Sequence, residues 1–317
     1  MLAVAVVAAA AVAVVAATVL SSGDGSAGGT ASTSPPAMRE GRPPLSFALG
    51  FRDDAEARDL ARGAALYQRG DSMAAALFAK HDTLEAKVGS ALAGWPHGSL
   101  ARLEQLAKLY PDAAVVQLHL GLARLWANQG DPIEAWRAVL DQEPDTPYAI
   151  VAGNLLHPDL PRGLPAFIPS FAASPAITHL PPRRQLDALR AAAEKGGLRE
   201  QLLYGVGLQR VGRAVSAARV FDRAARRYPD DVEAQVAGAV GRFDKDSPER
   251  AFGRLGPLTR TYPNEPTVRF HLGVLLLWTG RVEGAKRQFR LASQLQPGSP
   301  LALEASRYLE TIRRARS

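Results

Sequence analysis

Three stretches in the last third of the chain place a proline at a constant interval. They read "RRYPDDVEAQ" (226–235), "RTYPNEPTVR" (260–269) and "QLQPGSPLAL" (294–303). Their prolines, Pro229, Pro263 and Pro297, are spaced by 34 and 34 residues. Proline cannot continue a helix, and it pushes the residue before it out of the α region. The interval therefore predicts a repeating unit in which a helix ends at each proline.

Small and aromatic residues precede Pro229 and Pro297 at identical spacings. They are Gly205, Gly212, Ala217, Phe221 and Ala224 in one segment, and Gly273, Gly280, Ala285, Phe289 and Ala292 in the other. The first glycine of each set lets two helices approach closely, and the second suits the left-handed residue that ends a helix. The pattern predicts two antiparallel helices per repeat. A looser copy precedes Pro263, with Gly238, Ala239, Ala251, Leu255 and Leu258.

This pattern resembles the tetratricopeptide repeat (TPR), whose period is about 34 residues. The resemblance implies an all-α fold, a right-handed α-solenoid of antiparallel helix pairs. It places three repeats at 198–231, 232–265 and 266–299 within a C-terminal region at 186–317. The last residues of that region are expected to form the capping helix that solenoids require.

Weaker copies of the pattern occupy 53–152, where glycines recur as Gly63 and Gly70, and then as Gly121 and Gly130. A proline-rich irregular connector is expected at 153–185. Its segment 155–182 contains seven prolines but also many large apolar residues. Long loops without structure of their own are uncommon inside compact domains. Two interpretations remain: the segment packs in the concave groove of the solenoid, or it is an ordinary connector.

The first 52 residues differ from the rest. Residues 1–20 carry no charge and are long enough to cross a bilayer as a helix. We expect one N-terminal transmembrane helix as an uncleaved anchor, with a cleaved signal peptide as the alternative. Residues 21–52 are rich in Gly, Ser and Pro and are expected to form a disordered linker. A single-pass location follows, with the body expected on the extracytoplasmic side of a bacterial cell envelope.

The chain has 317 residues and no cysteine, which excludes disulfides and thiolate chemistry. It has no phosphate-binding glycine loop and no nucleophile motif, and its six histidines lack the spacing of a metal site. His119 and His271 fall inside predicted repeat helices and are interpreted as structural. No catalytic residue, cofactor site or metal site is predicted, and we expect the protein not to be an enzyme.

The resemblance implies that a partner binds the concave face formed by the first helix of each repeat. The matching positions are Leu202, Val206, Gln209, Val236, Val240, Phe243, Phe270, Val274 and Leu277. The family's clamp for carboxylate-ending tails uses Lys, Arg and Asn at such positions. This chain has mostly aliphatic residues there, which implies an apolar peptide or helix as the partner, or coverage of the groove by the chain's own segment 155–182. The alternative is that these side chains are mainly core between the repeats.

The second helices carry a basic surface. The net charge is +7, and residues 198–317 hold 21 basic and 12 acidic residues. The surface comprises Arg219, Arg223, Arg226, Arg227, Arg254, Lys286, Arg287 and Arg290. Contact with anionic lipid is one expected use. Nucleic acid is not expected as a partner, because no aromatic stacking residues are interleaved with the basic ones.

These features predict a membrane-anchored TPR scaffold that mediates protein–protein interaction at the cell envelope without catalysis. One alternative is a regulatory or substrate-recognition subunit of an envelope enzyme complex. Another is a cytosol-facing regulatory module that contacts nucleic acid through the basic surface.

Overall fold

The computed structural model describes residues 38–315, which contain helices and no strand. The expected membrane anchor at 1–20 and most of the expected linker lie outside the described residues. Within 38–315, every helix is too short or too polar to cross a membrane. The chain divides between Leu156 and His157 into two compact units, here called the N-unit (described over 38–156) and the C-unit (described over 157–315).

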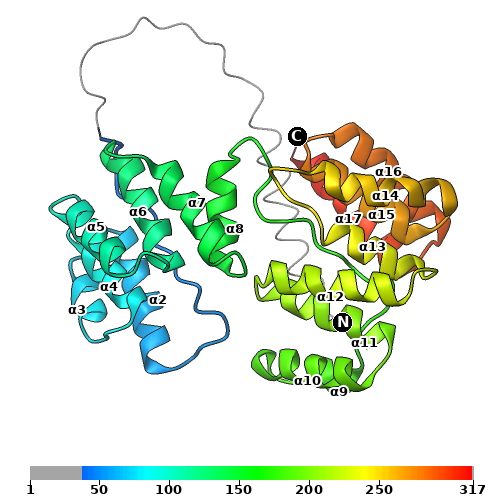
Figure 1. Cartoon of the computed structure of the whole chain (residues 1–317), viewed down its shortest axis with the longest axis horizontal. Helices are drawn as coiled ribbons and strands as arrows, with labels where there is room; N and C mark the ends of the chain where they lie inside the picture. The colour runs from blue at the N-terminus through cyan, green and yellow to red at the C-terminus, as the bar shows by residue number, and fades with distance from the viewer. Residues whose placement is uncertain (1–37, 316–317) are drawn as a thin grey trace, which may run out of the picture. The chain divides into compact units, whose positions relative to one another are not determined.

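The N-unit holds seven helices in the order in which Figure 1 colours them. They are α2 (Ala55–Gln68), α3 (Met73–Phe78), α4 (Leu84–Ala93), α5 (Ser99–Leu109), α6 (Ala114–Ala127), α7 (Pro132–Gln142) and α8 (Pro147–Leu156). Each helix contacts the next, and α2, α4, α6 and α8 also contact one another in succession. The first helices of the pairs therefore form one layer and the second helices another.

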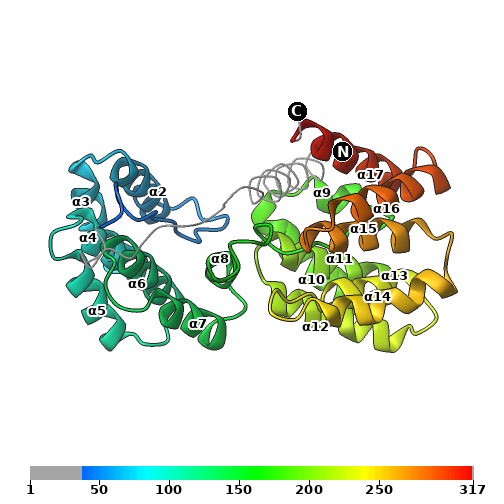
Figure 2. The same ribbon diagram turned by 90° about the horizontal axis from the view of Figure 1, so that it is seen from above.

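The C-unit repeats this arrangement (Figure 2). Its helices are α9 (Pro175–Thr178), α10 (Pro182–Lys195), α11 (Leu198–Arg210), α12 (Ala214–Arg227), α13 (Val232–Val240), α14 (Glu249–Thr261), α15 (Pro266–Trp278), α16 (Val282–Leu295) and α17 (Pro300–Arg314). Here α11, α13, α15 and α17 form the layer of first helices. The all-helical repeat fold agrees with the sequence pattern.

The glycines predicted to let two helices approach closely do lie at helix crossings, where each faces a phenylalanine ring. A β-carbon on Gly205 would overlap the ring of Phe221 in α12, and one on Gly273 would overlap Phe289 in α16. The glycines that follow α11 and α15 take the left-handed conformation, with φ +74° at Gly212 and +72° at Gly280. Such a residue closes the last turn of a helix at little steric cost. The glycine at the helix crossing thus allows the close pairing of the two helices, and the glycine after the first helix forms the turn between them.

The middle pair of the C-unit departs from the regular repeat. Helix α13 ends at Val240, and residues 241–248 form an irregular loop before α14. Asp244 closes a turn there by accepting a hydrogen bond from the backbone N–H of Asp246 at 2.9 Å. Short polar side chains compete with helical bonding in this way. Phe243, which the repeat pattern places on a first helix, lies instead in this loop.

Residues 38–52 require a correction of the expected linker. Leu45 is 6% exposed and belongs to the core of the N-unit, against which Phe47, Ala48 and Leu49 also pack. The expected linker has few large apolar residues, which is why its composition suggests disorder, but these few residues pack on the helices. The folded part therefore begins before Asp53.

Candidate functional site

Each unit carries an extended segment on the face of its first helices, here called the first-helix face. We call residues 39–49 the N-strap and residues 161–171 the C-strap. Figure 1 shows the C-strap as the green trace that follows α8 and precedes α9. It lies against the C-unit through Leu164, Phe167, Ile168 and Phe171, which pack on the buried core. Two interpretations were possible for segment 155–182, packing on the solenoid or an ordinary connector. Its central part, the C-strap, packs on the helices.

The C-strap is held by a buried histidine of α15. The backbone N–H of Ile168 donates to Nε2 of His271 at 3.0 Å. The other ring nitrogen, Nδ1, lies 2.7 Å from the carbonyl oxygen of Thr267. A carbonyl can only accept, so Nδ1 carries the proton and Nε2 is the acceptor. Burial lowers the pKa of His271 to about 4, which keeps the ring neutral and able to accept.

A second acceptor lies two residues further along the strap. The backbone N–H of Ser170 donates to Oε1 of Glu233, near the start of α13, at 3.0 Å. Burial raises the pKa of the Glu233 carboxyl. In an extended chain, residues i and i+2 present their N–H groups to the same side. Pro169, which has no N–H, therefore fits between the two donors without losing a bond.

The upstream end of the C-strap is fixed by the loop after α13. Lys245, a buried residue of this loop, donates from Nζ to the carbonyl oxygen of Pro161 at 2.8 Å. Burial lowers the pKa of Lys245 to about 8. His157 Nε2 lies 3.0 Å from Oδ1 of Asp246 in the same loop. The strap thus runs from the C-terminal end of α13 to its N-terminal end, antiparallel to that helix.

One aromatic side chain seats the C-strap in the core. Phe167 is 1% exposed, and its ring lies 5.0 Å from the ring of His271 in a stacked arrangement. The centroids of the Phe167 and Phe221 rings lie 5.4 Å apart in an edge-to-face arrangement. Aromatic pairs of these geometries add about 0.5–1.5 kcal/mol to the burial itself. Phe167 is therefore the main apolar anchor of this strap.

The N-strap is held in the same way. The backbone N–H of Ser46 donates to Nε2 of His119 in α6 at 3.3 Å, and His119 Nδ1 lies 2.7 Å from the carbonyl oxygen of Val115. Burial lowers the pKa of His119 to about 4. Two residues on, the N–H of Ala48 donates to the hydroxyl of Tyr148 at 3.0 Å. That hydroxyl lies 3.3 Å from Oε1 of Glu85, at the start of α4.

The loop after α4 fixes the upstream end of the N-strap. Trp95 Nε1 donates to the carbonyl oxygen of Gly41 at 3.2 Å. Arg42 adds a bond from Nη1 to the carbonyl oxygen of Tyr67 at 3.0 Å, with its guanidinium over the Tyr67 ring. This strap too runs antiparallel to the first helix of the middle pair.

The nine residues predicted to line a binding groove are mostly buried. Val206 and Gln209 are partly exposed, and the others are buried in the C-unit core: Leu202, Val236, Val240, Phe243, Phe270, Val274 and Leu277. The C-strap packs on the same core. These seven side chains are core residues of the C-unit, and contact with a partner at their positions stays a prediction.

The predicted basic surface is partly neutralised. Asp222 of α12 contacts Arg226 at 3.3 Å and Arg242 at 2.9 Å, with Arg254 at 3.9 Å. Lys286 pairs with Glu283 at 3.1 Å.

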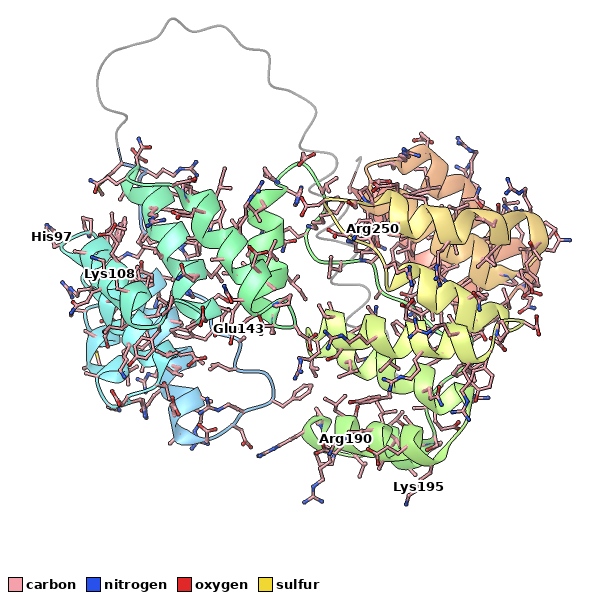
Figure 3. The ribbon with its side chains drawn as sticks, viewed as in Figure 1. His97, Lys108, Glu143, Arg190, Lys195 and Arg250 are labelled. Carbon is pink, nitrogen blue, oxygen red and sulfur yellow. The ribbon has the colours of Figure 1, made fainter. Side chains whose placement is uncertain are left out.

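The remaining members of the predicted surface are exposed. They are Arg219, Arg223, Arg227, Arg287 and Arg290. Arg250, labelled in Figure 3, is also exposed near the start of α14. An open cleft of about 310 Å³ between α16 and α17 is lined by Lys286, Arg290, Leu309 and Arg313. A contact with an anionic surface would involve the exposed arginines first.

The buried acceptors were not identified as site residues from the sequence. The sequence indicates structural roles for His119 and His271, and packing of 155–182 on the helices is one of its two interpretations, but nothing in it predicts that these histidines accept strap N–H groups or that residues 39–49 pack on the N-unit. A signal was present: both histidines begin a His-Leu-Gly triplet, with a tryptophan five residues after the glycine. Among the described residues, no group of three or more His, Asp or Glu side chains could hold a metal ion.

Comparisons with known proteins identify no family. No protein-family model matches the chain, and no curated protein matches its sequence. A crystal structure of yeast Tom70 aligns with a TM-score of 0.36 and 13% sequence identity, over 87% of this chain. The match covers 52% of that structure, so the chain spans about half its length. A likeness at this level carries no conclusion about function, which must be argued from the straps and the helices.

Proposed function

We propose that the chain is a membrane-anchored, non-catalytic helical-repeat scaffold of TPR type that binds protein segments at the cell envelope. What supports the proposal is the way each unit holds an extended segment on its first-helix face. Side-chain acceptors of the helices receive backbone N–H groups of the strap. A protein surface that hydrogen-bonds to main-chain groups in this way is suited to peptide recognition. In such recognition the main-chain bonds give affinity, and apolar contacts with alternate side chains of the peptide give specificity.

The anchor part of the proposal rests on residues 1–20, an uncharged apolar run long enough to span a bilayer. Residues 21–37, rich in Gly and Ser, would tether the folded units to it. Alkaline carbonate extraction of membranes tests the anchor, and added protease tests the side. An anchored protein stays in the pellet, and deletion of residues 2–20 releases it. Recovery of the full-length chain in the soluble fraction would contradict anchoring.

Binding is tested by photo-cross-linking in whole cells with the full-length chain. A photoreactive amino acid at Gln209, a partly exposed position on the first-helix layer, reports contacts of that face. A matched chain with the same amino acid at exposed Gly253, on the second-helix layer, is the control. We expect an adduct of defined mass from Gln209 and not from Gly253. Equal labelling of many proteins from both positions would count against a scaffold that binds through this face.

A further inference from the structure

The two units share a strap, a histidine and a glutamate in corresponding places. Residues 117–126 of α6 read "QLHLGLARLW", and residues 269–278 of α15 read "RFHLGVLLLW". His, Leu, Gly, a second Leu and Trp are identical in the two helices. Helices α4 and α13 also begin alike, with Glu85 and Glu233 as their second residues. The N-unit has seven helices after its strap, and the C-unit has the same seven after α9 and α10.

The straps correspond to each other when they are aligned on their N–H donors. Ser46 then matches Ile168, and Ala48 matches Ser170. The aligned positions upstream also agree: Gly41 and Gly163 have φ of +80° and +81°, Pro43 and Pro165 are both buried, and Leu45 and Phe167 are both buried. Each strap therefore presents the form Gly-x-Pro-x-large apolar, followed by two donors two residues apart.

We propose that the two units are copies of one module whose first-helix face is a binding site for an extended Gly-x-Pro-x-apolar segment. In each unit the chain's own strap occupies the site, and a segment of the same form from a partner protein takes its place. This inference rests on the proposed scaffold function and names the partner's chemistry.

The contacts that hold the straps define what a partner segment must offer. The acceptors are His271 and Glu233 in the C-unit, and His119 and the Tyr148 hydroxyl, which itself lies against Glu85, in the N-unit. All of them bind main-chain N–H groups, so they place no demand on the side chains at those two positions. The core under each strap takes one large apolar side chain, Leu45 in the N-unit and Phe167 in the C-unit. The residue between the donors needs no N–H, because Pro169 stands there in the C-strap. The site thus accepts different sequences of one backbone form.

A strap is exchangeable because few fully buried contacts hold it. The donors of the C-strap make two bonds to the first helices, Lys245 binds the carbonyl of Pro161, and one aromatic ring is fully buried, whereas the other large apolar side chains of the strap are only partly buried. Segments held by few buried contacts open at lower free energy than the helices around them. A partner segment at sufficient concentration then competes with the tethered strap, whose advantage is its high effective concentration.

The test uses the full chain with its own C-strap weakened by Phe167→Ala and Ile168→Pro. The probe is a fluorescent peptide of residues 160–172, "LPRGLPAFIPSFA". We expect it to bind the weakened chain at least about tenfold more tightly than the unaltered chain, a difference of about 1.4 kcal/mol. The same peptide with Ile168→Pro lacks the N–H donor to His271 and is the matched control, expected to bind at least about tenfold more weakly. A peptide of residues 38–50 is expected to compete with the probe.

Three results would overturn the proposal: no binding of the probe to a weakened chain that keeps its helical circular dichroism, equal binding of the control peptide, or failure of the 38–50 peptide to compete.

If the weakened chain unfolds, hydrogen exchange of the unaltered chain tests the proposal instead. Excess probe should speed exchange at Ile168 and Ser170 and leave α15 unchanged. If these amides exchange as slowly as those of α15, with or without the probe, the strap is a fixed part of the core and the proposal is wrong. A chain that fails these tests but cross-links through Gln209 in cells keeps the scaffold function and loses only strap exchange.

Discussion

The backbone N–H of Ile168 donates to Nε2 of His271 at 3.0 Å, across 103 positions of sequence. The N-unit repeats this relationship between Ser46 and His119 at 3.3 Å, across 73 positions. In both units the acceptor lies in the third helix pair and the donor precedes the first. The strap contact therefore links the two ends of each unit, and it cannot form until the third pair is in place.

Replacing His271 by phenylalanine should destabilise the C-unit. The ring is fully buried, and phenylalanine keeps much of its shape but leaves the N–H of Ile168 without an acceptor. An unsatisfied buried donor costs about 1–3 kcal/mol. We expect a lower urea midpoint by circular dichroism and faster hydrogen exchange at 164–171. His271→Gln, which retains an acceptor oxygen, should lose less.

His119→Phe is the matched variant in the other unit. It should speed exchange at 44–49 and leave the exchange of 164–171 unchanged, because each histidine contacts only the strap of its own unit. A His271→Phe chain as stable as the unaltered one, with unchanged exchange of its strap, would show that the bond contributes nothing.

Stability should fall as the pH is lowered from about 6.5 to about 4. Burial holds the pKa of His119 and His271 at about 4, below the ordinary value of 6.5. In this window the unfolded chain binds protons at these rings and the folded chain does not. Each histidine then removes about 1.4 kcal/mol of unfolding free energy per pH unit. Urea unfolding at several pH values measures the slope.

Glu233 acts in the opposite direction in the C-unit. Burial raises its pKa above 4.5, so the folded state binds a proton at its carboxyl before the unfolded state does. Its protonation therefore favours the folded state as the pH falls through that raised pKa. His271→Gln should flatten the slope, and adding Glu233→Gln to it should remove the opposing contribution. A slope unaffected by replacing either histidine would assign the pH dependence to other groups.

The helix pairs could be predicted from the sequence because their signals are local. Gly212 and Pro229 act on the turn and the helix end where they stand, and spacing alone places them. The helix lengths were less predictable: α13 stops at Val240 because the loop to α14 carries turn residues and the strap anchor Lys245. The loop after α13 departs from the repeat where Lys245 binds the carbonyl of Pro161, and no local sequence pattern reveals a contact between residues so far apart.

The straps could not be predicted in full for the same reason. The C-strap has enough large apolar residues to suggest packing in the concave groove of the solenoid, with an ordinary connector as the alternative, but its hydrogen-bond partners are not visible in the sequence. The N-strap has the composition of a linker, and its seat depends on His119 and Tyr148, which lie 73 and 100 residues away from their donors. Comparing the two His-Leu-Gly triplets would have linked the units, but only the structure shows what their ring nitrogens contact.

Gly205→Ala should destabilise the C-unit by overpacking. The added β-carbon overlaps the ring of Phe221, which is fully buried in the core. Extra carbon in a packed core typically costs about 1–3 kcal/mol. Gly253→Ala is the control, because it lies in α14 with open space around its β-carbon. Alanine there should stabilise by about 0.5–1 kcal/mol. Thermal unfolding of the two variants should shift in opposite directions, and equal shifts would contradict the close crossing.

The exposed arginines of α12 should bind anionic membranes if the basic surface is a lipid contact. Each basic residue near such a surface contributes about 1 kcal/mol. The double variant Arg219→Glu, Arg223→Glu should therefore lower affinity for phosphatidylserine vesicles by more than about tenfold, measured by co-sedimentation at low salt. Arg58→Glu, Arg62→Glu makes the same change of net charge on exposed positions of α2. Only the first variant should lose binding, since a local surface and not the net charge makes the contact. An equal loss in both variants would assign vesicle binding to overall charge, and no loss in either would remove lipid from the roles of this surface.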